Sequence, residues 1–97
     1  MKLHQKGFLL VEISKVRSIW DSELIAKALK EYGLTGSYWV NSLCVALDEL
    51  AAAGLIVRVG SKLDDGKQLA PGRLLFNWRL SEFGRSRMRD TGLLNYP

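Results

Sequence analysis

Side chains capable of covalent or metal chemistry are few in this 97-residue chain, and they do not cluster. The one histidine, His4, lies near the start, and the one cysteine, Cys44, lies at the edge of an apolar run with helical spacing. The carboxylate pairs Asp48-Glu49 and Asp64-Asp65 are adjacent in sequence, so neither pair converges as a general acid and a general base must. No His/Cys cluster has metal-ligand spacing, and no glycine-rich phosphate loop precedes a helix. We therefore expect no catalytic residues, no metal site and no cofactor.

Basic side chains offer a different chemistry, the binding of a polyanion. The net charge of +4 is unevenly distributed along the chain. Residues 1–20 carry four basic and one acidic side chain, residues 21–54 carry two and five, and residues 55–97 carry eight and four. Two basic segments therefore flank an acidic middle. A basic surface attracts nucleic acid, although a solvated surface rich in lysine and arginine and without a partner is the alternative.

The length and the cysteine content limit the number of domains and the cellular compartment that we expect. Ninety-seven residues suffice for one domain with a single core. One cysteine cannot form an internal disulfide, which fits a reducing cytoplasm. The longest apolar stretches, 8–11 and 50–57, are far shorter than the roughly 20 residues that span a bilayer, and no signal-peptide pattern is present at the start. We expect a cytoplasmic protein that does not contact a membrane.

Residues 37–54 predict the helix around which the chain is organised. Ser37 can cap its start by accepting a hydrogen bond from an early backbone N–H, and Gly54 supplies the left-handed residue that ends such a helix. At about 100° per residue the helix has one apolar arc and one mixed arc. The apolar arc, which we expect to be buried, carries Trp39, Val40, Leu43, Leu47, Leu50 and Ala51. The mixed arc carries Tyr38, Asn41, Ser42, Val45, Asp48, Glu49 and Ala52.

Two further helices are predicted before this one. Apolar residues recur at helical spacing over residues 3–17, with an interruption at Gly7. Residues 18–20 form a short extended link. Asp21 or Ser22 then caps a second helix that runs to Tyr32, and the turn at residues 33–36 leads into the central helix. Two helices joined by a glycine-containing turn form a helix-turn-helix.

A hairpin and a last helix are predicted after it. Residues 55–59 are rich in β-branched side chains, and residues 73–80 alternate between two faces, so each stretch predicts a strand. One face of the second strand carries Leu74, Phe76, Trp78 and Leu80. Ser81 caps a helix over residues 82–89, in which Arg85, Arg87 and Arg89 are interpreted as a solvated, positively charged helix end. Residues 91–97 form a flexible tail. All three tryptophans, at positions 20, 39 and 78, are expected to pack in the core.

Two stretches resemble bacterial transcriptional regulators of the MarR and PadR type. Leu43-x3-Leu47-x2-Leu50-x3-Gly54-Leu-Ile56 resembles their recognition helix and first wing strand. Trp78-Arg-Leu-Ser-Glu-Phe-Gly-Arg85 resembles the stretch by which their chain leaves the wing. The resemblance covers about residues 19–89. It implies an α+β winged helix-turn-helix domain over residues 1–97, with a three-helix core, a two-stranded β-hairpin wing at about 55–80 and a short C-terminal helix.

This resemblance implies sequence-specific binding of double-stranded DNA. The protein would then be a bacterial transcription regulator, a repressor by default because a bound domain blocks polymerase. The exposed N-terminal half of the central helix would enter a major groove. Its base-facing residues would be Tyr38, Asn41, Ser42 and Val45. Phosphate contacts would come from Lys27, Lys30, Arg58, Lys62, Lys67 and Arg73, and they would carry most of the affinity.

The central helix departs from that family in its charge. No Lys or Arg occurs from Tyr38 to Ala53, whereas Asp48 and Glu49 do. A winged-helix module that docks on another protein through Tyr38 and Val45, and does not bind DNA, therefore remains the alternative. A homodimer, if one forms, would use the first helix and the tail at residues 93–96.

Overall fold

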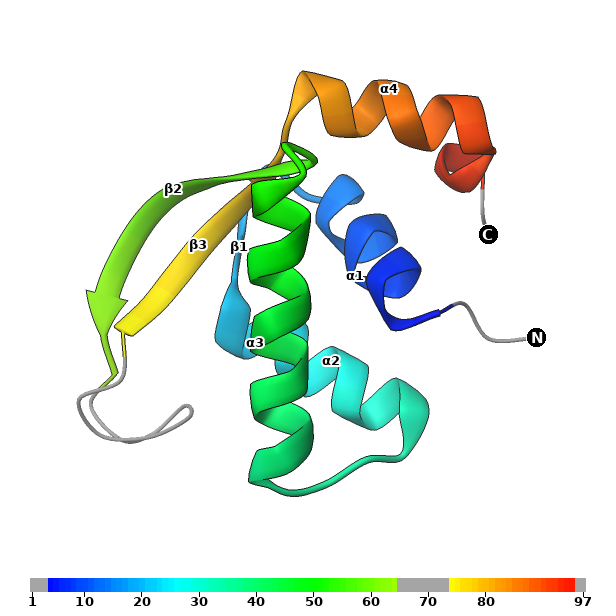
Figure 1. Cartoon of the computed structure of the whole chain (residues 1–97). Coiled ribbons are helices and arrows are strands. Elements are labelled where there is room, and N and C mark those ends of the chain that lie inside the picture. Colours follow the sequence, from blue (N-terminus) through cyan, green and yellow to red (C-terminus); the bar gives the residue numbers. More distant parts are fainter. Residues whose placement is uncertain (1–3, 65–73, 96–97) are drawn as a thin grey trace.

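The chain folds as a small α+β domain. The computed structural model describes residues 4–64 and 74–95 (Figure 1). Within them the helices are α1 (Gln5–Ser14), α2 (Asp21–Tyr32), α3 (Ser37–Ala52), α4 (Glu82–Thr91) and the 3-10 helix η1 (Leu93–Asn95). The strands are β1 (Ile19–Trp20), β2 (Ile56–Leu63) and β3 (Leu74–Leu80), which form an antiparallel sheet in the order β1-β3-β2.

The core lies between one face of this sheet and the helices. Residues that pair directly across antiparallel strands share a face, so Ile19 of β1, Trp78 of β3 and Arg58 of β2 lie on the same side. Trp78 is 1% exposed and is the largest of the fully buried side chains. Around it pack buried residues from every α-helix, among them Leu9, Ile13, Leu24, Ile25, Leu43, Leu47 and Met88. α3 runs along the front of this layer in Figure 1, and α4 crosses above it.

The two arcs predicted for α3 are confirmed apart from Trp39, although Val40 and Ala51 of the apolar arc are only partly buried against the core. Leu43, Leu47 and Leu50 are buried, whereas Tyr38 and Val45 are exposed. Trp39 is only half-buried and lies outside the core, so its predicted burial is wrong. Its ring instead stacks on that of Tyr38, with 4.9 Å between ring centroids. Trp39 lies in the first turn, before α3 meets the sheet, and a neighbouring aromatic ring covers it there.

Trp20 is also half-buried and lies outside the core, contrary to the prediction. It pairs with Asn77, on the face of the sheet opposite to Trp78. The same alternation places Leu75 on that second face, where it is nevertheless completely buried, while Leu74 at the start of β3 is 45% exposed. The predicted assignment of β3 residues to two faces is therefore correct, but the second face also buries a leucine.

The predicted helix starts lie within about two residues of the observed ones, but not all of the predicted caps are correct. At α4 the Ser81 hydroxyl accepts a hydrogen bond from Gly84 N–H at 2.8 Å, as expected for a cap. At α3 the capping position is Gly36, with φ of 102°, and no side chain caps the helix, so the role predicted for Ser37 is wrong. At α2 neither Asp21 nor Ser22 is the cap, because the helix already includes both. The Asp21 carboxylate instead accepts a hydrogen bond from Phe76 N–H of β3.

One corner joins the two halves of the structure. α3 ends as predicted at Gly54 (φ 80°), with hydrogen bonds from Gly54 N–H to Ala51 O and from Leu55 N–H to Leu50 O. Against this turn lies the start of α4. Ser81 N–H donates to Leu55 O at 3.1 Å, and the Ser81 hydroxyl lies 2.6 Å from Gly54 O. A Cβ atom on Gly84 would overlap the Leu55 carbonyl oxygen. We call these contacts the Leu55–Gly84 corner.

The C-terminal residues return to the helical layer. α4 ends at Gly92 in the left-handed conformation, and Leu93 and Leu94 of η1 are partly buried against the core beside α1. The tail predicted from residue 91 thus begins with ordered helix, whereas Tyr96 and Pro97 lie outside the described residues. The apolar side chains of α1 likewise pack within this same chain.

The Leu55–Gly84 corner predicts a large effect of one methyl group. Gly84→Ala should lower the free energy of unfolding by about 3 kcal/mol, because the added methyl forces two backbone segments apart. Gly60→Ala is the matched control, since its methyl would meet only Asn77 Cβ at an ordinary 3.6 Å, and it should cost less than about 1 kcal/mol. Urea unfolding followed by circular dichroism measures both. Equal stability of the two variants would contradict the packing of this corner.

Candidate nucleic-acid interface

The outer face of α3 presents four of the predicted contact residues together. Tyr38, Asn41 and Val45 are exposed and Ser42 is half-buried. They occupy the first nine residues of α3, on the side that faces away from the sheet. Side chains three, four and seven residues apart lie along one helix face, so these four form a single surface over about two turns. We call this surface the α3 face.

The start of α3 is suited to an anion. No side chain caps it and its first turn contains no acidic residue. The early N–H groups of a helix have no partner within the helix, and the helix dipole adds partial positive charge there. A phosphate oxygen can accept hydrogen bonds from such groups. Ser37 was predicted to cap this end, but no side chain does so. The N–H donors of the first turn are therefore available to solvent or to a ligand.

The far half of α3 has the opposite character. Asp48 and Glu49 are exposed near its C-terminal end. Glu49 forms an ion pair with Lys6 of α1, with 3.5 Å between Oε1 and Nζ, and both side chains are well exposed. An exposed pair of this kind is screened by water and contributes little to stability. The charge of α3 thus favours an anion near its N-terminal half and disfavours one near its C-terminal half.

Arg58 lies on the same side of the sheet as α3. It pairs with Trp78 in the β2–β3 register, and the two therefore share a face. Its guanidinium carbon lies 3.7 Å from the centroid of the Phe76 ring and 5.3 Å from that of Trp78. Stacking on these rings orients the guanidinium plane, while its N–H groups at the edge can still donate to an anion. Of the predicted phosphate-binding residues that the structure describes, Arg58 is the one that the strand register places on the side of α3.

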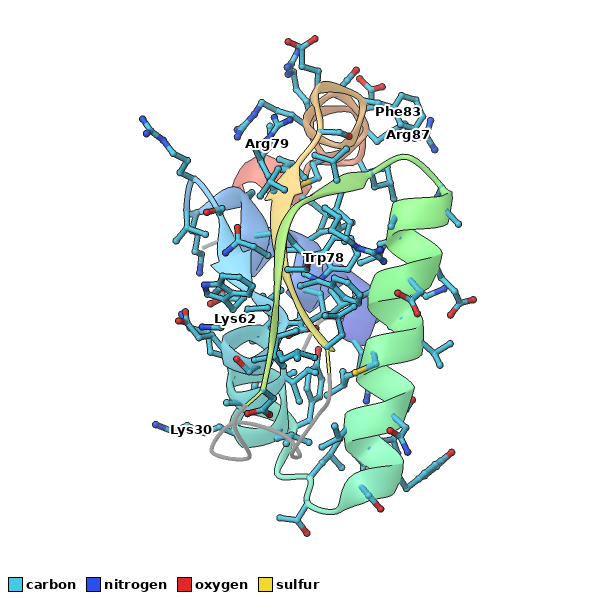
Figure 2. The ribbon with its side chains drawn as sticks, turned by 90° about the vertical axis from the view of Figure 1, so that its left-hand side faces the viewer. Lys30, Lys62, Trp78, Arg79, Phe83 and Arg87 are labelled. Carbon is cyan, nitrogen blue, oxygen red and sulfur yellow. The ribbon has the colours of Figure 1, made fainter. Side chains whose placement is uncertain are left out.

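Lys62 and the lysines of α2 lie elsewhere. Lys62 pairs with Leu75, on the second face of the sheet, and its ammonium lies 4.3 Å from the centroid of the Trp20 ring. Figure 2 shows Lys30 and Lys62 on the side of the molecule opposite to α3. Lys27 forms an ion pair with Glu12 of α1 at 3.5 Å. The predicted contact residues are therefore split between two sides, and Lys67 and Arg73 lie outside the described residues.

Glu12 forms ion pairs with two lysines. Lys15 Nζ lies 2.9 Å and Lys27 Nζ 3.5 Å from its carboxylate oxygens. Burial raises the pKa of Glu12, but the hydrogen bond and positive charge of Lys15, with the charge of Lys27, outweigh it and hold the pKa below its usual range. Glu12 is thus ionised at neutral pH and neutralises part of the positive charge that Lys27 could offer a phosphate.

One cationic surface was missed in the sequence. Arg17, Arg79 and Arg85 line a common groove, although they lie in three different elements. The two basic segments at the ends of the sequence were the only signal for this surface. No spacing rule indicates which residues of the two segments lie together in the fold.

Other kinds of site receive no support from the described residues. Among them no three His, Cys, Asp or Glu side chains are grouped so as to hold a metal ion. None of the helices in the described ranges has the length and hydropathy needed to cross a membrane. Comparison of the chain with protein-family models, with curated proteins and with solved structures finds no match.

Proposed function

We propose that the chain is a winged helix-turn-helix domain related to MarR- and PadR-type regulators. The element order, with α2 and α3 joined by a short turn and β2 and β3 following, supports this proposal. So does the sheet order β1-β3-β2, in which the short strand before α2 pairs with the second hairpin strand. The two stretches that resemble the family contact each other at the Leu55–Gly84 corner. The β2–β3 hairpin is then the wing.

We further propose that the protein binds double-stranded DNA and represses transcription by occupying it, with no cofactor. The observation that carries this proposal is the α3 face, which is exposed, polar at Asn41 and Ser42, and adjoins an uncapped helix start. In a major groove Asn41 can form two hydrogen bonds with adenine, and Val45 can contact a thymine methyl group. Tyr38 or Ser42 would reach a phosphate or a base edge, and Arg58 would contact the backbone.

The α3 face can be tested at its amide. Duplexes selected by the protein from a random pool provide a cognate site. On that site Asn41→Ala should weaken binding by about 1–3 kcal/mol, because it removes a bidentate contact to a base. On random duplexes the same variant should bind almost as wild type does, since phosphate contacts persist. Fluorescence anisotropy measures both affinities. Equal losses on the two kinds of duplex would contradict base readout by Asn41.

A second candidate function is docking on another protein. It is favoured by the exposure of two large side chains on α3, Tyr38 at 65% and Val45 at 55%, on a helix without Lys or Arg. Exposed aromatic and aliphatic groups of this kind can anchor a protein interface. A homodimer through α1 and the C-terminal residues also stays a prediction, and it would have to use surfaces left after Leu93 and Leu94 pack on the core.

A charge placed on α3 separates the two functions. If α3 faces DNA, Val45→Lys should strengthen binding to random duplexes and steepen the dependence of log K on log salt by about one unit. Ala53→Lys is the matched control, because it adds the same charge at the exposed residue that caps the C-terminal end of α3, about 12 Å further along the helix axis. It should change the affinity much less. If α3 docks on a protein, Val45→Lys should bind duplexes no better than Ala53→Lys and should lose the partner that wild type recovers.

A further inference from the structure

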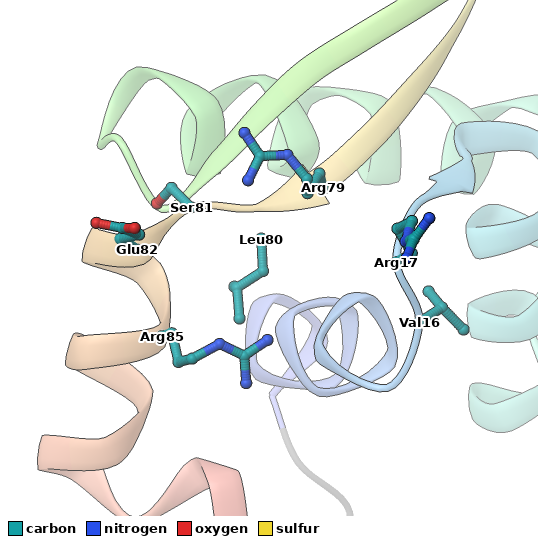
Figure 3. Close-up of a pocket in the computed structure, with 7 residues that line it drawn as sticks. All are labelled: Val16, Arg17, Arg79, Leu80, Ser81, Glu82 and Arg85. Carbon is teal, nitrogen blue, oxygen red and sulfur yellow. The ribbon is translucent and has the colours of Figure 1, made fainter.

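An arginine-lined groove lies where α4, β3 and the link between α1 and β1 meet. Its volume is about 310 Å³. Arg17 comes from the link, Arg79 from the end of β3 and Arg85 from the first half of α4. Figure 3 shows these three side chains around the groove, with Leu80 between them. The groove thus joins one residue of the N-terminal basic segment to two of the C-terminal basic segment.

The three arginines of this groove form no ion pair within the described part of the chain. The ion pairs found there use the lysines at positions 6, 15 and 27, and none involves Arg17, Arg79 or Arg85. Glu82 also lines the groove, but its carboxylate points away from the three arginines in Figure 3. Like charges held near one another repel, and an anion between them relieves that repulsion. The arrangement therefore favours a ligand with more than one negative charge.

Hydrogen bonds fix the segment that holds two of the three arginines. Arg79 and Arg85 flank Ser81, whose N–H and hydroxyl bind the turn after α3 at the Leu55–Gly84 corner. The N-terminal end of α4 adds the partial positive charge of a helix dipole. Leu80 is buried beneath the groove and Val16 is 42% exposed at its side, so the groove also has an apolar wall. Its volume is at the lower end of the range for small-molecule sites.

We propose that this groove binds a phosphate ester. Guanidinium groups donate paired hydrogen bonds to phosphate oxygens, and the three arginines that line the groove supply several such donors. The apolar wall of Val16 and Leu80 can contact the organic part of the ester. Two sources share this chemistry, a free nucleotide and the backbone of a polynucleotide. The site does not depend on the function proposed for α3, because α4 and the N-terminal half of α3 lie at opposite ends of the molecule in Figure 1.

Titrations followed by NMR test the groove directly. The Nε–Hε signals of Arg17, Arg79 and Arg85 are followed as AMP, adenosine or a single-stranded thymidine dodecamer is added to the whole chain. AMP should shift these signals and adenosine should not, because adenosine lacks the phosphate. A dodecamer that binds more tightly than AMP at equal phosphate concentration identifies a polynucleotide backbone as the source. A dodecamer that binds more weakly than AMP identifies a free nucleotide as the source.

Charge-matched variants show whether the groove or the net charge is responsible. Arg85→Gln and Arg79→Gln should each weaken binding of the preferred ligand about tenfold. Arg87→Gln is the matched control, because it removes the same charge from α4 at a residue that does not line the groove and lies beside Phe83 in Figure 2. The affinity of this variant for the ligand should stay within twofold of wild type. Asn41→Ala should also leave AMP binding unchanged, because Asn41 lies on α3 and does not line the groove. A failure of DNA recognition by α3 can therefore be distinguished from a failure of the groove proposal. The proposal is overturned if Arg87→Gln loses as much affinity as Arg85→Gln, if adenosine binds like AMP, or if the three arginine signals do not move.

Discussion

The packing of Gly84 on the backbone of Leu55 is the constraint on which the rest of the structure depends. Two backbone segments can approach this closely only where one of them has no Cβ atom. The contact fixes the end of α3 against the start of α4, and Ser81 adds hydrogen bonds to the same turn. Because β2 leaves from that turn and β3 arrives at it, the corner also aligns the sheet with α3. The corner also helps to place Arg79 and Arg85, which flank Ser81, at the groove.

Sequence reasoning succeeded where one local pattern decides the outcome. The apolar arc of α3 has few ways to be buried, so its leucines were predicted correctly as core. Gly54 and Ser81 were also assigned correctly, because a left-handed residue and a capping hydroxyl act on their own neighbours in the chain. Residues 18–20 were predicted to be extended, and β1 within them is extended and pairs with β3.

The failures occurred where distant residues compete for the same group. Asp21 can cap α2 by local rules, but its carboxylate instead accepts a hydrogen bond from the Phe76 N–H of β3, 55 residues away. Trp39 belongs to the apolar arc by periodicity, yet the sheet does not extend to the first turn of α3, and Tyr38 covers it instead. The residues predicted to contact phosphate were chosen by residue type alone. Strand register then placed Arg58 and Lys62 on opposite faces, and tertiary packing grouped three arginines that periodicity treats as unrelated.

The central claim is that the N-terminal half of α3 contacts a polyanion. The most direct measurement is a titration of the labelled protein with the selected duplex at two salt concentrations, in which the backbone amide signals of residues 36–45 are followed by NMR. The account predicts that these amides shift most and that the affinity falls as salt rises, because phosphate contacts release counterions. Shifts confined to other segments, or binding that is absent at low salt or insensitive to salt, would contradict it.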